Sequence, residues 1–471
     1  MVTLNDTSSL DCPFTLPNRG GPLTDYFTRF SEAHVQHPAI IVTPTSEDHV
    51  IAAIQFAKAN NLSLFAATGG HGTFACIGPN TMFMNMAAFQ AINLDQKRGQ
   101  VEVGGGVITG QLLKSLAKIG YYTTLANANA VGVVAAILGG GNSAYNGLHG
   151  FMADNAIRFR VVTSTGDVQD IGASCTGDEL ALFNTLCGAG HGLGIVLSVK
   201  FRAYSIKSLG LTDGKLWSRV MFFPPTALED VAEAFTSLSP PDKRLSITFT
   251  MARGPPSTPF EGKPLIVLAA LYFGPSEAAE QAAASLIAPE LQQKALMVNQ
   301  EPLAFENTND ALEKMYSYGG ARSTNGCRVQ TLSASSIISM FNTFVAFTNG
   351  AEKAGIVLHS FNPSQLTANG HDPDLGSRSV ECRDFGFTLV MSLWCSSEAK
   401  LAEANDGFVE EMLTLVGTDD DHLMLRTFPN VMKFKQDITE MFTPTRIAQM
   451  RQVKQRWDPE CVFWSPYNFE P

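Results

Sequence analysis

The stretch that most constrains this chain is a short glycine-rich loop that follows an apolar run. It reads Phe65-Ala-Ala-Thr-Gly-Gly-His-Gly72, so three glycines surround one histidine. Glycines leave backbone N–H groups open to a ligand, and several such donors can converge on a phosphate. A glycine-rich loop alone is more often a plain turn, and its histidine more often a hydrogen-bonded structural residue. The loop therefore predicts an anion site only where other segments support it.

Alternating strand and helix patterns surround this loop in the first 205 residues. Apolar runs at 40–42 and 62–65 predict strands, and a helix between them begins after Ser46, a typical N-cap residue that two acidic side chains follow. Further strands are expected at residues 82–86, 91–94, 100–104, 158–163, 168–171 and 195–203, and helices at 111–118 and 178–186. A small-residue tract at 126–141 would let the backbone lie close to a flat or bulky ligand, and another glycine-rich loop stands at 188–194.

The pattern changes from about residue 206 to residue 430. Long strands are expected at 216–223, 245–252, 265–273 and 385–394, and amphipathic helices at 227–238, 277–291, 335–347 and 398–415. Such a succession predicts an antiparallel sheet covered by helices, hence a separate α+β unit. A last helix is expected at 446–457, where Asp458-Pro459 ends it.

Composition limits the possible partners and the cellular location. The 471 residues are 45% hydrophobic, enough for two domains with sizeable cores. A net charge of -11 without a basic cluster argues against nucleic acid or an anionic membrane as partner. No apolar run reaches transmembrane length and the N-terminus lacks signal-peptide features, so a cytoplasmic protein is expected, with secretion left open if a leader was removed.

Several common ligand motifs are missing from the sequence. Neither 139–145 nor 188–194 completes the dinucleotide fingerprint G-x-G-x-x-G, and no P-loop occurs. The eight cysteines form no C-x-x-C pair and have no histidine spacing suited to zinc, so no metal site is predicted. The glycine loops therefore need a different common explanation.

Five motifs, taken together and in this order, carry a family resemblance. They are Thr68-Gly-Gly-His71, Val131-Gly-Val-x4-Leu-Gly-Gly-Gly141, Gly150-x3-Asp-Asn155, the run Gly188 to Val196, and the closing Lys454-x2-Trp-Asp-Pro-Glu-Cys-Val-Phe463. The chain resembles flavoproteins of the vanillyl-alcohol oxidase type, which have the PCMH-type FAD-binding fold, and within them the berberine-bridge-enzyme-like oxidoreductases. The tail is closer to the fungal, secondary-metabolism branch.

The resemblance implies a two-domain α+β fold that holds FAD. The FAD-binding domain would comprise residues 1–205 and a returning segment 431–471, with an antiparallel, helix-covered substrate domain at 206–430 inserted between them. It also implies that His71 bonds covalently to the 8α-methyl carbon of the flavin. Many relatives add a cysteine bond to flavin C6, but the matching position here is Ala128, so one covalent bond at most is expected.

The resemblance also implies which residues contact FAD. They are Thr68, Gly69, Gly70, His71, Gly72, Val131, Gly132, Leu138, Gly139, Gly140, Gly141, Asp154, Gly194, Ile195 and Asn468. Two arginines usual in the family are absent, because Ala67 and Cys187 stand at their positions. Fewer cations near the phosphates would weaken non-covalent binding, so the covalent bond or backbone donors must dominate.

Catalysis in such a site needs a base near flavin N5 while hydride passes to the ring. Candidates are Tyr145, Tyr318 and His359, together with Tyr316 and the charged group Arg378, Glu381 and Asp384. By resemblance, the expected activity is oxidation of a hydrophobic small molecule of secondary metabolism, with oxygen as electron acceptor. Two alternatives remain open: a flavin-scaffold cyclase that catalyses a non-redox cycloaddition, and a binding protein that has lost FAD. Nothing in the sequence indicates an oligomeric state.

Overall fold

The first part of the chain begins with a small sheet against which the glycine–histidine loop is placed. The structure, a computed structural model, describes residues 7–310, 313, 318–417 and 427–467. Four strands lie in the order β1 (Phe14–Thr15), β2 (Ile40–Val42), β4 (Thr81–Asn85) and β3 (Ser63–Ala67), with β2 and β3 parallel to β4. Helix α1 (Glu47–Ala59) joins β2 to β3, and the Ser46 side chain accepts a hydrogen bond from the N–H of His49 as its predicted cap.

A five-stranded antiparallel sheet follows. Its order is β5 (Ile92–Asp95), β6 (Gln100–Gly104), β10 (Ile195–Arg202), β8 (Ala156–Val162) and β9 (Val168–Gly172), while β7 (Tyr121–Tyr122) pairs with β11 (Tyr204–Ser205). The helices here are α2 (Thr109–Ala117), α3 (Val133–Leu138), α4 (Asn146–His149) and α5 (Gly177–Ala189). These strands and α2 confirm the predicted pattern.

Two helices differ from the sequence prediction. The tract predicted as a close backbone approach contains helix α3, because six apolar residues without glycine separate Gly132 from Gly139. Helix α5 extends past its predicted end and kinks at Cys187 and Gly188, where φ is 121° at the glycine. A Cβ at position 188 would overlap the carbonyl oxygen of Ser379, so only glycine allows this packing.

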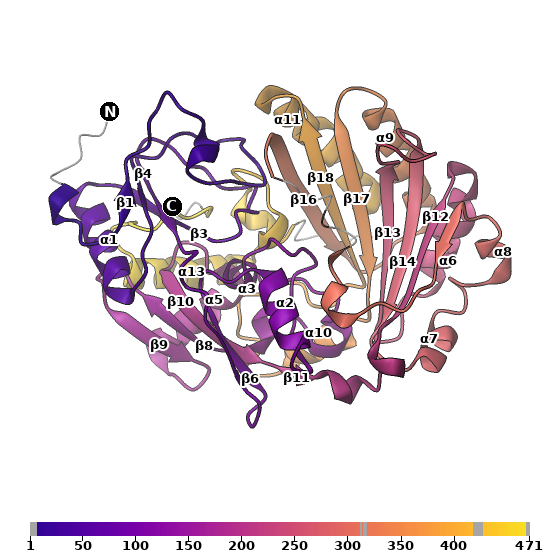
Figure 1. Cartoon of the computed structure of the whole chain (residues 1–471), viewed down its shortest axis with the longest axis horizontal. Coiled ribbons are helices and arrows are strands. Elements are labelled where there is room, and N and C mark those ends of the chain that lie inside the picture. Colours follow the sequence, from indigo (N-terminus) through magenta and orange to yellow (C-terminus); the bar gives the residue numbers. More distant parts are fainter. Residues whose placement is uncertain (1–6, 311–312, 314–317, 418–426, 468–471) are drawn as a thin grey trace.

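The second part of the chain is a seven-stranded antiparallel sheet (Figure 1). Its order is β15 (Met297–Asn299), β12 (Trp217–Phe223), β14 (Pro264–Tyr272), β13 (Leu245–Arg253), β17 (Lys353–Ser360), β18 (Phe387–Cys395) and β16 (Ala321–Val329). The helices are α6 (Leu228–Ser237), α7 (Ser276–Ala282), α8 (Pro289–Gln292), α9 (Ala334–Thr348), α10 (Ser364–His371), α11 (Glu398–Ala404) and α12 (Glu410–Gly417). The helix predicted at 277–291 is wrong as one element, because Pro289 starts α8 as a new helix.

Side-chain alternation separates the two faces of the seven-stranded sheet. Phe249 and Leu358 are buried in one core with helices α6, α9 and α12. Thr248 pairs directly with His359 and therefore lies on the opposite face. Val390, which pairs with Val357 two residues from His359, belongs to this second face and is half-buried. The sheet thus has one closed face and one that contributes to a cavity.

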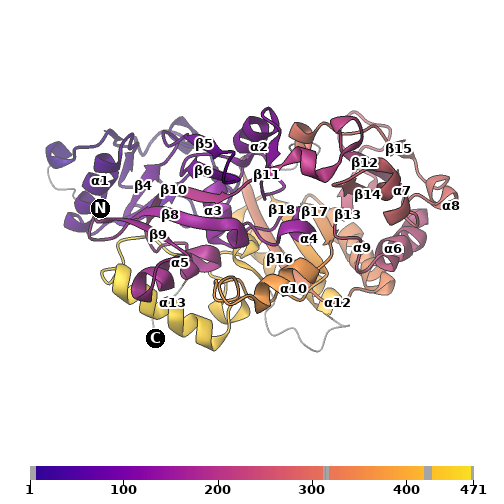
Figure 2. The same cartoon turned by 90° about the horizontal axis from the view of Figure 1, so that it is seen from below.

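The end of the chain returns to the first part. Helix α13 (Pro444–Trp457) contacts α5, and Figure 2 shows the two side by side. The closing motif is a buried anchor in which Lys454 Nζ lies 2.6 Å from Asp458 Oδ2 and donates to the carbonyl of Gly192. Phe463 then pairs with Leu64 of β3.

The sheets give the chain the α+β fold expected from its sequence, with α13 and the tail packed on the first part. The domain bounds 1–205, 206–430 and 431–471 stay a prediction. In the described part of the chain, we find no helix of the length and apolarity needed to cross a membrane.

Candidate active site

A cavity of about 320 Å³ lies where the glycine–histidine loop meets the other two glycine tracts. The loop, defined here as Thr68–Gly72, forms one wall. The tract at 126–141 and the loop at 191–196 form others, and Thr324 and Val390 contribute from the seven-stranded sheet. The cavity is therefore built from both parts of the chain.

The carbonyl oxygens of the loop are held by residues from distant segments. Those of Gly69, Gly70 and Gly72 accept hydrogen bonds from Tyr318 Oη (2.8 Å), Phe30 N–H (3.0 Å) and Arg29 Nη2 (2.7 Å), respectively. No described residue accepts a hydrogen bond from the N–H groups of these three glycines. Donors that converge without intervening side chains bind anions such as phosphate.

The loop packs directly against the second glycine tract. A Cβ at Gly69 would overlap the carbonyl oxygen of Ala130, and one at Gly132 would lie 3.0 Å from Cβ of Thr68. Thr68 Oγ1 also donates to the carbonyl of Gly105 at 2.7 Å. The loop and the second glycine tract are therefore in direct contact, with no space for a side chain at Gly69.

Gly69→Ala is expected to lower the free energy of unfolding by about 1–3 kcal/mol, because the added methyl group must displace the backbone of the facing tract. Urea denaturation measures the change. Gly78→Ala is the matched control, since a Cβ there meets no atom within 4 Å. Equal stability of the two variants would show that the walls are not in this close contact.

His71 lines the cavity with its ring fixed on two sides. Phe30 stacks on it at a centroid distance of 5.1 Å, and Tyr318 meets it edge-on at 5.3 Å. Nδ1 lies 3.1 Å from the carbonyl oxygen of Gly69. Because a carbonyl oxygen only accepts, this contact assigns the proton to Nδ1 and the lone pair to Nε2.

Most of the residues predicted to contact FAD line this cavity. They are Thr68, Gly69, Gly70, His71, Gly72, Val131, Gly132, Leu138, Gly141, Gly194 and Ile195. Ala128 lies in the same lining, which contains no cysteine among the described residues. Gly139, Gly140 and Asp154 lie outside the lining, and Asn468 and Tyr316 fall outside the described residues.

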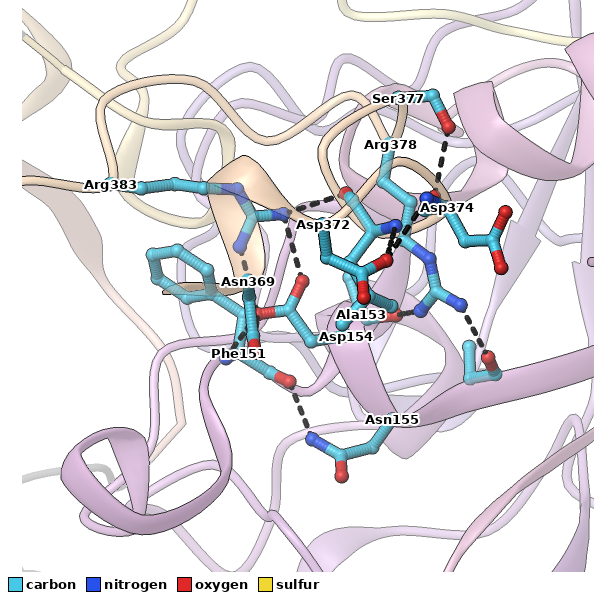
Figure 3. Close-up of polar contacts among 12 residues, drawn as sticks. Phe151, Ala153, Asp154, Asn155, Asn369, Asp372, Asp374, Ser377, Arg378 and Arg383 are labelled. Carbon is cyan, nitrogen blue, oxygen red and sulfur yellow. Dashed lines mark hydrogen bonds and ion pairs between the residues drawn. The ribbon is translucent and has the colours of Figure 1, made fainter. Parts of the chain in front are cut away.

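Asp154 is instead the centre of a buried ion pair (Figure 3). Its carboxylate accepts two hydrogen bonds from Arg383, each 2.8 Å long, one from Asn369 Nδ2 and one from the N–H of Phe151. The two charged side chains are 1% and 8% exposed. This carboxylate is therefore fully occupied in joining the first part of the chain to the segment after α10.

None of the three main catalytic candidates belongs to the cavity lining. Tyr145 is buried against Tyr122 and Phe273, and burial raises its pKa. His359 Nε2 lies 2.8 Å from Ser246 Oγ, and burial lowers the pKa of this histidine to about 4. Tyr318 touches the loop itself, where its hydroxyl donates to Gly69.

The charged candidates also have structural partners. Arg378 donates to the carbonyls of Ala153 and Ala156, Glu381 pairs with Arg446, and Asp384 accepts from Gln330.

Several residues of the cavity lining were not predicted as site residues from the sequence. They are Arg29, Asn127, Asn142, His191, Asn430 and Trp464. His191 stands in a second Gly-His-Gly sequence, and its similarity to the first loop is the signal that could have indicated it. Burial lowers the pKa of His191 to about 4. In the described lining, the ionisable groups are Arg29, His71 and His191, with no carboxylate.

The comparisons with known proteins agree with this geometry. The family described as FAD binding domain matches residues 38–172, which contain the loop and the second glycine tract. The chain is 27% identical to "FAD-linked oxidoreductase hasG" of Aspergillus fumigatus, over 90% of this chain and 89% of that protein. The chain is an FAD-dependent oxidoreductase.

Solved structures establish the fold of this oxidoreductase. It is similar to 6-hydroxy-D-nicotine oxidase from Arthrobacter nicotinovorans, with a TM-score of 0.80, 18% identity and complete coverage of both chains. It is also similar to BBE-like 1 of Physcomitrella patens, with a TM-score of 0.79, 18% identity and 98% coverage of each chain. The oxidoreductase thus has the berberine-bridge-enzyme-like fold expected from its motifs.

Proposed function

We propose that this oxidoreductase holds FAD through a single covalent bond from His71 and oxidises a hydrophobic small molecule of secondary metabolism, with oxygen as electron acceptor. The observation that carries the proposal is the loop, whose glycine N–H groups and His71 ring share one cavity. Nε2 of His71 has the lone pair that a bond to carbon requires. Ala128 offers no thiol for a second bond.

The wall residues suit an extended flavin cofactor. Gly69, Gly70 and Gly72 would hold the pyrophosphate through their N–H groups. The small side chain of Ala128 in the lining leaves room for a flat ring system. Bound FAD supplies a hydride acceptor and a route for electrons to oxygen. The chain's own residues bind, orient and enclose the reacting groups.

The lining favours an uncharged, largely apolar substrate. Val134, Val390, Phe428 and Val431 supply apolar surface to the cavity. A cationic substrate would find no carboxylate among the described lining residues, and burial of an unpaired charge is unfavourable. Asn142, whose side chain also contacts Asn146, offers an amide for orientation. The relatives' printed names include (R)-6-hydroxynicotine oxidase, an oxidase of a small molecule.

Anaerobic mixing with a panel of uncharged, apolar phenols, alcohols and arylamines tests this activity. A substrate is expected to bleach the yellow flavin absorbance, and admission of air to restore it with one peroxide formed per substrate oxidised. Turnover without oxygen while the flavin stays oxidised would contradict oxidation and indicate the non-redox cyclase instead. A colourless protein would contradict the bound cofactor.

A further inference from the structure

Arg29 is a buried cation in the wall of the cavity. Arg29 is 4% exposed, and its guanidinium carbon lies 5.3 Å from the centroid of the Phe65 ring. Burial lowers its pKa to about 10, so the side chain remains charged at neutral pH. Among the described residues, no carboxylate forms an ion pair with it, and no acceptor contacts its Nε.

The position of this charge is set by the glycine–histidine loop. Nη2 donates to the carbonyl of Gly72 at 2.7 Å, in the same loop as the glycine N–H groups for which the described residues supply no acceptor. Residues 65–72 contain no lysine or arginine, so Arg29 brings the positive charge to this loop from outside it. Arg29 also precedes residues 38–172, where the FAD-binding family matches.

A buried arginine without a counter-charge is unfavourable unless an anion joins it. The chain offers this cation a neighbourhood of N–H donors and aromatic surface. An anionic ligand in the cavity would relieve the desolvation of the guanidinium, and it would receive charge-assisted hydrogen bonds. The part of FAD with this chemistry is its pyrophosphate.

We propose that Arg29 is a cofactor-binding residue that neutralises the pyrophosphate of FAD beside the loop. This assignment rests on the proposed FAD site and deepens it. It supplies the cation that position 67, an alanine, does not. A guanidinium suits this role because its planar N–H fork matches phosphate oxygens while one N–H stays on Gly72.

Binding measurements in a His71→Ala background test the assignment, because non-covalent affinity can then be measured on apoprotein. FAD, FMN and riboflavin are titrated against protein fluorescence. Arg29→Gln is expected to weaken FAD binding about 10-fold or more and FMN binding in the same direction, as loss of a charge-assisted hydrogen bond to phosphate predicts. Riboflavin, which has no phosphate, should keep its affinity within about twofold. Arg29→Lys should recover part of the FAD affinity.

Arg322→Gln is the matched control. Arg322 also lies over an aromatic ring beside the loop, at 5.0 Å from Phe30, but it does not line the cavity. Its replacement should leave the affinities for all three flavins unchanged. Equal weakening of FAD and riboflavin binding by Arg29→Gln would give Arg29 a purely structural role. Weakening of FAD binding alone would place Arg29 at the adenine part of the cofactor. Either result overturns the proposal.

A failure of the FAD site itself has a different signature. If the His71→Ala protein with Arg29 intact binds no flavin and the unmodified protein is colourless, the proposed function and this assignment both fall. If Arg29→Gln binds FAD as tightly as its parent, only the assignment of Arg29 falls.

Discussion

Asp154→Asn is expected to lower the free energy of unfolding by about 3–5 kcal/mol, because Arg383 would stay buried without its counter-charge. The carboxylate accepts four hydrogen bonds, two of them from the Arg383 guanidinium at 2.8 Å. An asparagine keeps the shape but loses the charge, and its NH2 group would face donors that need an acceptor. The pair joins two segments 229 residues apart, so the loss should loosen the contact between the two parts of the chain.

Urea denaturation followed by tryptophan fluorescence measures this loss. The matched control is Asp178→Asn, which breaks an ion pair with Arg456 whose side chains are 64% and 62% exposed. An exposed pair of this kind contributes about 0–1 kcal/mol. If the Asp154 and Asp178 variants unfold at the same urea concentration, the buried pair does not have the stabilising role assigned to it.

His71→Ala is expected to abolish flavin attachment to the polypeptide while the variant still folds. The ring contacts Phe30 and Tyr318, but the backbone bonds that hold the loop come from other groups and remain in the variant. FAD should then leave the protein on dilution or unfolding, because the proposed contacts with the backbone donors and Arg29 would hold it only reversibly. Flavin measured in the filtrate after denaturation gives the result.

His191→Ala serves as the control for this variant. His191 lines the same cavity and stands in a similar Gly-His-Gly sequence. Its loss should leave flavin attached, since a bond through one histidine does not require the other. Attachment that survives His71→Ala but disappears in His191→Ala would move the covalent site to the second loop.

Local patterns in the sequence predicted the part of the fold around the loop. The Ser46 cap, the apolar spacing of α1 and the strands on either side are short-range signals, so each could be recognised alone. Strand β16 was missed because Ala321–Val329 mixes arginine, asparagine and glycine without clear alternation. Its register is fixed by pairing with β18 along the whole strand, a long-range constraint that no local pattern contains.

The candidate site shows the same difference between contiguous motifs and long-range contacts. The loop and the tract at 131–141 are contiguous motifs, and most of their residues line one cavity. Arg29 stands in an irregular segment 43 residues before its partner Gly72, so no spacing rule indicates it. Asp154 was assigned to the cofactor from its motif, whereas the structure gives its carboxylate to Arg383, whose position the sequence could not connect with it.

The most direct test is an absorbance spectrum of the unmodified protein after acid precipitation and washing. If His71 carries FAD covalently, the yellow flavin absorbance stays with the redissolved polypeptide, and proteolysis yields one flavin-bearing peptide that contains residues 68–72. A colourless precipitate with free FAD in the supernatant would contradict the covalent assignment.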